Sequence, residues 1–157
     1  LSPKENREIP PLCYDMVYRV KQDFPDLDVI INGGLTSLDD ADKHLKQVDG
    51  VMVGREAYSN PYFLVDVDRR FFAETGVVRS RHEILAAFLP YISAQLAQGR
   101  RLNQMSRHLV GLFLGQPGAR AWRRHLSENA HKGGAGIEVL ETGARYVEEA
   151  IETVANR

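Results

Sequence analysis

The chain has 157 residues, of which 43% are apolar and 26% charged, and its formal net charge is −1. This composition is typical of a globular domain, and a single cysteine excludes a disulfide framework. No apolar run approaches the ~20 residues of a membrane-spanning helix and the N-terminal residues lack a signal-peptide pattern, so we expect no membrane association and a cytoplasmic location.

The first half of the chain alternates between helix and strand patterns. Apolar spacing predicts a helix at 13–23, and a β-branched run predicts a buried strand at 28–31. A serine cap followed by acidic residues predicts a helix at 37–47, and another apolar run predicts a strand at 50–54. After a loop, a proline in the first turn predicts a helix at 61–72. This alternation implies that the two strands pair in parallel.

The second half has only helical periodicity. Four helices are predicted, at 85–96, 107–114, 119–130 and 137–154. Trp122 is expected in their shared core. We therefore expect an α/β part at residues 1–75 and an all-α part at residues 76–157.

Charge is segregated along the chain. Residues 1–78 carry a formal charge of −5, residues 79–132 carry +7 and residues 133–157 carry −3. Eight of the nine basic residues in the middle segment are arginine, which binds phosphate through two hydrogen bonds. The segment is either a surface for a polyanion or a solvated helix face whose acidic partners lie elsewhere in the fold.

Glycines follow both predicted strands, in Asn32-Gly33-Gly34 and in Gly54-Arg55. Backbone N–H groups can approach an anion closely at glycine, and parallel strands end at the same edge of a sheet. In (β/α)8 barrels the loops after the last two strands frequently hold a phosphate group. The alternative is that these glycines only permit short turns.

Three arginines of the predicted helix at 119–130 stand at i, i+3 and i+4. These are Arg120, Arg123 and Arg124, and the spacing predicts that all three point to one side. Such a face can contact several phosphates of a nucleic acid backbone, and the alternative is again a solvated face.

Histidine and cysteine give no catalytic or metal-binding pattern. The five histidines are too scattered for a ligand set, and we expect no metal site. His44 is expected at the surface, on the helix at 37–47. Cys13 is expected to be half-buried and without a catalytic role.

Several runs of residues resemble the A-type tRNA-dihydrouridine synthases of bacteria. They are Leu-Ser-Pro-Lys-Glu-Asn-Arg-Glu-Ile-Pro-Pro-Leu at 1–12, Ile-Asn-Gly-Gly at 31–34, and the segments 49–58, 111–113, 118–124 and 126–132. The resemblance covers essentially the whole chain and corresponds to the C-terminal half of such a protein. We therefore expect the chain to be a piece of a longer protein.

The resemblance implies a fold and an activity. Residues 1–75 would be the C-terminal part of an FMN-binding TIM barrel, with its last two strands and helices, and residues 76–157 a helical tRNA-binding bundle. In that family NADPH supplies the reducing equivalents, and a uridine in the D-loop of tRNA becomes 5,6-dihydrouridine. The working enzyme is expected to be a monomer that binds the D-loop and elbow region of tRNA.

The resemblance also implies roles for individual residues. Five would hold FMN, chiefly its phosphate: Asn32, Gly33, Gly34, Gly54 and Arg55. Four would contact tRNA: Lys4, Arg7, Arg120 and Arg123. The family's catalytic cysteine corresponds to a position upstream of this chain, so the chain alone is expected to be inactive.

Two other functions stay open at this point. One is a non-catalytic RNA-binding module built on the helical part. The other is a different phosphate-binding barrel enzyme, such as an isomerase, although a small-substrate isomerase has no use for a helical segment with a charge of +7.

Overall fold

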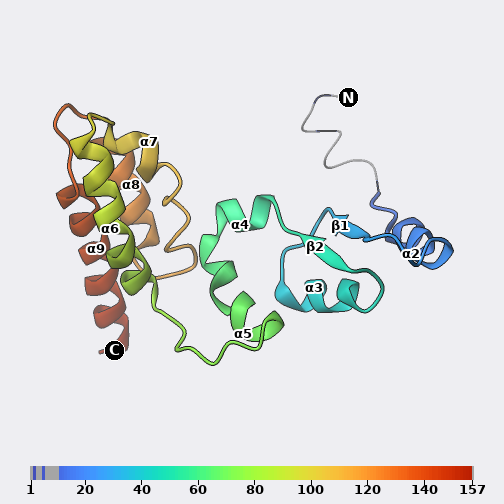
Figure 1. Ribbon diagram of the computed structural model, residues 1–157. Coiled ribbons are helices and arrows are strands. Elements are labelled where there is room, and N and C mark those ends of the chain that lie inside the picture. Colours follow the sequence, from blue (N-terminus) through green and yellow to red (C-terminus); the bar gives the residue numbers. More distant parts are fainter. Residues whose placement is uncertain (1, 3–4, 6–10, 157) are drawn as a thin grey trace. The chain divides into compact units, whose positions relative to one another are not determined.

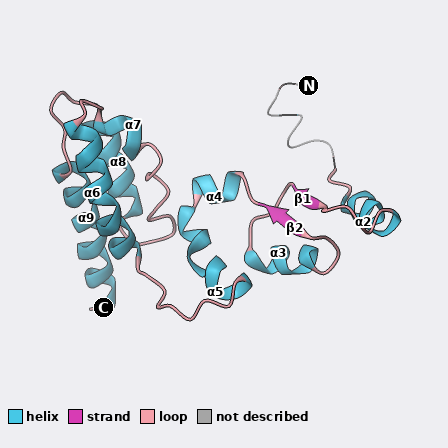
Figure 2. Cartoon of the chain, in the orientation of Figure 1, coloured by secondary structure: helices cyan, strands magenta, loops and turns pink. Residues whose placement is uncertain are grey.

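The computed structural model describes residues 2, 5 and 11–156. The chain forms two compact units, Leu1–Glu56 and Ala57–Arg157. Helices and strands alternate in the first unit, whereas the second is helical (Figures 1 and 2). The predicted division after residue 75 concerns function and stays a prediction.

The first unit is built from two helices and two strands. They are α2 (Tyr14–Asp23), β1 (Ile30–Asn32), α3 (Leu38–Leu45) and β2 (Gly50–Met52). The strands pair in parallel, with Ile30 opposite Gly50 and Asn32 opposite Met52. Both strands, both helices and the parallel pairing confirm the sequence predictions, with helix and strand ends that differ by a few residues.

One face of this small sheet is covered and the other is open. Ile31 is 1% exposed, whereas Ile30 is 65% exposed and Met52, which pairs with Asn32 on the neighbouring strand, is 54% exposed. Side chains alternate across a strand, so Ile30 and Asn32 lie on the open face and Ile31 on the covered face. The covered side includes α3, which contacts β2.

Local hydrogen bonds fix the ends of these elements. The Ser37 hydroxyl accepts a hydrogen bond from the Asp40 N–H at 3.1 Å and so caps α3 as predicted. The Asp49 carboxylate accepts from the Val29 N–H at 2.8 Å and forms an ion pair with Lys21 of α2 at 2.9 Å. These two contacts hold the pKa of Asp49 below its usual value.

The segment between the sheet and the helical bundle differs from the prediction. Residues expected to form a loop begin with a short helix, α4 (Arg55–Ser59), and the single helix expected at 61–72 is divided into η1 (Pro61–Asp66) and α5 (Val67–Phe71). The Phe63 N–H donates to the Asn60 carbonyl at 2.9 Å, which is the tighter i to i+3 pattern of a 3-10 helix.

The bundle consists of α6 (Arg81–Ala97), α7 (Leu102–Ser106), α8 (Ala119–Asn129) and α9 (Glu138–Ala155) (Figure 1). Ser80 and Glu83 form a reciprocal capping box at the start of α6. Leu85 and Ile92 are buried in the core, and Phe88, Leu89 and Leu96 pack against it, so the predicted apolar stripe is confirmed. The predicted helices at 119–130 and 137–154 are also confirmed.

The helix predicted at 107–114 is wrong. The regular helix, α7, ends at Ser106, and residues 107–115 form turns. Two carbonyls of this segment accept hydrogen bonds from side chains: the Leu109 oxygen from Trp122 Nε1 at 3.2 Å, and the Leu112 oxygen from Arg81 Nε at 2.9 Å. These long-range hydrogen bonds take the place of the backbone hydrogen bonds of a helix. The periodicity of the sequence cannot reveal such bonds, because their donors lie in other segments.

The helices in the described part of the chain lack the combination of length and apolar composition that a membrane span requires.

Candidate phosphate and RNA sites

Asn32 and Gly54-Arg55 follow the same edge of the sheet. The register pairs Asn32 with Met52, so the segments that follow β1 and β2 leave the sheet at the same edge. The Asn32 side chain is exposed at the end of β1, and Arg55 is exposed at the start of α4. The structure therefore brings together the two segments that the sequence analysis singled out.

The first glycine pair has a structural reason of its own. Gly33 and Gly34 have φ values of +122° and +64°, which side-chain-bearing residues rarely adopt. A Cβ atom at Gly34 would lie 2.8 Å from a methyl carbon of Leu12 and from the Tyr14 hydroxyl. That hydroxyl donates to the Gly33 carbonyl at 2.8 Å. The turn interpretation thus accounts for both glycines without a ligand.

Gly54 is different, because nothing in the fold requires a glycine there. Its φ lies outside the left-handed region, and a Cβ atom would meet no atom within 4 Å. The guanidinium of Arg55 forms no ion pair or hydrogen bond with the described residues. Open space next to an unpaired cation suits an anionic group, so the fit to a phosphate rests on Gly54 and Arg55 rather than on Gly33 and Gly34.

His44 is buried, contrary to the prediction. It is 7% exposed, its Nδ1 lies 2.6 Å from the Tyr18 hydroxyl, and the Tyr14 ring lies edge-on at 4.5 Å. His44 lies one turn after buried Ala41 on the covered side of α3, and this spacing was the missed signal. With Gly34 and Lys43 it lines a cavity of about 410 Å³.

The three arginines of α8 do not all line the same cavity. Arg120 and Arg124 line a cavity of about 500 Å³ with His125, Glu128 and Tyr146, and Arg123 does not line it. Successive residues turn by about 100°, so Arg123 and Arg124 lie about a quarter turn apart. Arg123 is half-buried, whereas Arg120 and Arg124 are exposed. The i, i+3 and i+4 positions span an arc of about 100° on the regular helix, which agrees with the predicted single side, although only Arg120 and Arg124 line this cavity.

None of these three guanidinium groups is neutralised. No ion pair with a described residue includes Arg120, Arg123 or Arg124. In their cavity, the His125 Nε2 atom is buried and lacks a hydrogen-bond partner among the described residues. Trp122, on the opposite side of α8, is fully buried as predicted. Lys4 and Arg7, the other predicted tRNA contacts, lie outside the described residues.

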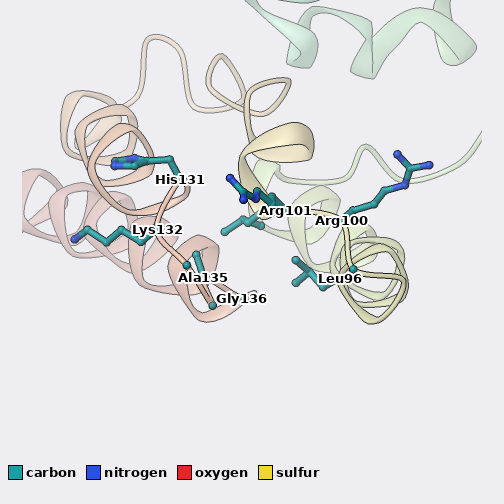
Figure 3. Close-up of a pocket in the computed structure, with 11 residues that line it drawn as sticks. Leu96, Arg100, Arg101, His131, Lys132, Ala135 and Gly136 are labelled. Carbon is teal, nitrogen blue, oxygen red and sulfur yellow. The ribbon is translucent and has the colours of Figure 1, made fainter.

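A second basic cavity was not anticipated. It has a volume of about 510 Å³ and lies between the α6–α7 turn and the α8–α9 loop (Figure 3). Its lining includes Arg100, Arg101, His131 and Lys132. The signal in the sequence is the glycine-rich run at 133–136, directly after Lys132.

The remaining candidate, Cys13, is exposed rather than half-buried, and its thiol lies 3.8 Å from the Pro11 carbonyl. Within the described part of the chain, no group of three or more His, Cys, Asp or Glu side chains is placed to hold a metal ion.

Comparison of the sequence with known protein families identifies the class of protein to which the chain belongs. The residue pattern of the dihydrouridine synthase (Dus) family matches residues 2–150. The chain therefore belongs to the dihydrouridine synthase family.

The similar curated proteins have a more particular name, tRNA-dihydrouridine(20/20a) synthase. The protein from Shewanella oneidensis is 60% identical over 148 residues, which are 94% of this chain and 44% of the relative. The protein from Vibrio cholerae is 55% identical over 141 residues, 90% of this chain and 43% of the relative. The protein from Escherichia coli K12 is 55% identical over 147 residues, 94% of this chain and 43% of the relative. The chain thus spans less than half the length of these relatives.

Proposed function

We propose that this chain is part of an FMN-dependent enzyme that reduces a D-loop uridine of tRNA to 5,6-dihydrouridine with NADPH. The observation that carries the proposal is the 55–60% identity to proteins named tRNA-dihydrouridine(20/20a) synthase along at least 90% of the chain. Because the chain spans 43–44% of those relatives, catalysis is expected to need the rest of their length.

The direct test uses a protein that carries this chain at the full length of its relatives. With FMN, NADPH and unmodified tRNA, we expect NADPH oxidation that depends on the tRNA, and dihydrouridine in the recovered RNA. The 157-residue chain alone is the matched control and is expected to leave the RNA unchanged. Absence of dihydrouridine with the full-length protein would contradict the proposed activity.

The open face of the sheet supports the barrel assignment. In a (β/α)8 barrel the helices cover the outer face of the strands. The side chains on the other face of each strand point into the barrel interior. Here Ile31 is buried on one face, whereas Ile30 and Met52 are exposed on the other. We infer that the exposed face belongs to a barrel interior, with β1 and β2 as its last two strands.

The FMN proposal concerns the edge at which those strands end. Bound FMN would supply the redox chemistry of the reaction. Gly54 gives room for close approach of the phosphate, Arg55 offers an unpaired guanidinium, and the exposed Asn32 amide lies at the end of the neighbouring strand. Gly33 and Gly34 would contribute by shaping the loop, because Leu12 and Tyr14 already approach them closely.

The tRNA proposal concerns α8. Arg120 and Arg123 match the family's tRNA-contacting positions, and both charges are free to pair with phosphate. Lys4 and Arg7 are proposed as further contacts on the same basis of family resemblance. A non-catalytic RNA-binding module is the second candidate, favoured by the charge of +7 over residues 79–132.

Arg120→Ala and Arg123→Ala are each expected to weaken tRNA binding about tenfold, because each removes a charged hydrogen-bond donor to phosphate. Fluorescence anisotropy with unmodified tRNA at several salt concentrations checks this, and the slope of log affinity against log salt should become shallower by about 1. Arg145→Ala is the matched control, because Arg145 is an exposed arginine of α9 that lines neither basic cavity. If Arg123→Ala binds tRNA as tightly as the unchanged chain does, the assignment of Arg123 fails.

A further inference from the structure

The cavity between the α6–α7 turn and the α8–α9 loop has the composition of an anion site. Eleven residues line it, three of them basic and none acidic. Its apolar wall comes from Leu96, Leu102 and Ala135, and Leu102 is 1% exposed. Its volume of about 510 Å³ lies within the usual range for small-molecule sites. An apolar wall beside basic residues matches a nucleotide unit, with its ribose and base on the wall and its phosphate against the cations.

The basic groups keep their charge available. Neither Arg100 nor Arg101 forms an ion pair with a described residue. The Lys132 Nζ donates to the neutral Asn129 amide oxygen at 2.7 Å, which leaves its charge unneutralised. In Figure 3 Arg101 lies between the two loops, whereas Arg100 extends away from them. Arg101 is therefore the group best placed to contact a ligand.

The glycine-rich loop supplies a second, independent indication. Gly134 has a φ of +77°, a backbone conformation that explains why a glycine stands at this position. Gly133 has no such φ, and a Cβ atom there would meet nothing within 4 Å. Neither the fold nor the conformation requires a glycine at 133, and close approach of a ligand to the backbone is a remaining reason for one.

The loop also offers hydrogen-bond donors. No carbonyl or side chain of the described residues accepts from the N–H groups of Gly133 and Gly134. The Ala135 N–H donates to the Lys132 carbonyl at 3.3 Å, and the Gly136 N–H donates to the Glu138 carboxylate at 2.8 Å. Glu138 itself does not line the cavity, and its carboxylate is held at Gly136, at one end of the loop.

We propose that this cavity binds a phosphate group of RNA, as a contact separate from the arginines of α8. Arg101 would pair with the phosphate, and the Gly133 and Gly134 N–H groups would donate to it, while Lys132, whose side chain points away from Arg101, would add positive charge nearby (Figure 3). The two cavities share no lining residue. The choice of RNA as the source of the phosphate rests on the proposed function, whereas the phosphate site itself does not.

The test is Arg101→Ala in the full 157-residue chain. Arg101 is exposed, so the change is expected to leave the unfolding midpoint unaltered. Affinity for unmodified tRNA should fall about fivefold to tenfold, and the salt slope should become shallower by about 1. Arg145→Ala is again the matched arginine control.

A second variant tests the loop by steric means. Gly133→Ala adds one methyl group where the fold leaves open space, so folding is preserved while the backbone becomes less accessible to phosphate. Affinity for tRNA should fall severalfold. Gly76→Ala is the matched control, because Gly76 also has open space and no left-handed φ.

Nuclear magnetic resonance separates the possible outcomes. The amide signals of Gly133 and Gly134 should shift on titration with tRNA in the unchanged chain and fail to shift in Arg101→Ala. If Arg123→Ala weakens tRNA binding while Arg101→Ala and Gly133→Ala do not, the cavity proposal is overturned and the proposed function stands. If the chain binds no tRNA at low salt, titration with inorganic phosphate decides: shifts of the two glycine signals support a site for a free phosphate compound, and unchanged signals overturn the site.

Discussion

Replacing Trp122 with alanine is expected to destabilise the helical unit by about 3–5 kcal/mol. Trp122 is completely buried, and its ring meets Phe113 edge-on at a centroid distance of 4.9 Å. A Cβ atom at Gly143 would lie 2.8 Å from the indole ring, which shows how closely α9 packs over it. The expected loss is a large part of the ~5–15 kcal/mol that holds a typical domain folded.

Trp122→Phe separates the two contributions of the indole. It keeps most of the apolar volume but removes the Nε1 donor, which leaves the Leu109 carbonyl without the hydrogen bond seen at 3.2 Å. We expect a smaller loss of about 1–3 kcal/mol. Phe72→Ala is the control for truncating an aromatic side chain, because Phe72 is 71% exposed and its loss should change stability by no more than about 0.5 kcal/mol.

The measurement is urea unfolding of the full chain, monitored by far-ultraviolet circular dichroism, which reports mainly on the helices. Trp122→Ala should shift the midpoint to much lower urea or leave the bundle unfolded in buffer. Unfolding at the same urea concentration as the unchanged chain would show that the bundle does not depend on this side chain. It would also remove the reason for expecting the turn at 107–115 to be held by the indole.

Local signals in the sequence predicted those elements whose ends are set by nearby residues. Ser37 caps α3 through the Asp40 N–H, within one turn of helix, and was predicted to do so; the Ser80–Glu83 cap is equally local, although the start of α6 was predicted four residues too late. The apolar stripe of α6 is likewise a property of one segment. Such elements were predicted correctly because their determinants lie a few residues apart.

Elements that depend on distant residues were missed. A Cβ atom at Gly111 would lie 2.0 Å from the Ser59 carbonyl oxygen, so this glycine marks a close backbone approach across 52 residues. The segment around it gives up helical structure for that approach and for the bonds from Trp122 and Arg81. No periodicity within 107–114 contains this information.

The candidate sites divide in the same way. That Asn32 and Arg55 lie near one edge followed from the alternation of helix and strand, which is a local pattern. That Arg101 and Lys132 line one cavity depends on how α6 and α8 pack, although 31 residues separate them in the chain. The sequence showed an excess of positive charge over 79–132 but could not divide that charge between two surfaces.

Arg55→Ala is expected to abolish most FMN retention in a protein that carries this chain at the full length of its relatives. The change removes an unpaired guanidinium beside the open space at Gly54 and with it the charged hydrogen bonds proposed for the phosphate. Such bonds contribute about 1.5–3 kcal/mol, so FMN affinity should fall by roughly tenfold to 150-fold. Arg55→Lys keeps the charge but loses the two parallel hydrogen bonds of a guanidinium. Its FMN affinity should therefore lie between that of Arg55→Ala and that of the unchanged protein.

The measurement is the visible absorption spectrum of the purified protein before and after addition of FMN and removal of the excess. Arg19→Ala is the matched control, because Arg19 is an exposed arginine of α2 that pairs with Asp23 at 3.7 Å. Its flavin content should equal that of the unchanged protein.

Affinity for tRNA should be unaffected in Arg55→Ala, since the proposed RNA contacts of the described residues lie in the helical bundle. The pair of readouts therefore separates cofactor binding from RNA binding. A folded Arg55→Ala protein with full flavin content would show that the phosphate is held elsewhere. A folded unchanged protein that takes up no FMN would overturn the site at Asn32 and Gly54-Arg55 and favour the RNA-binding module, because the basic bundle would then be the remaining functional surface of the chain.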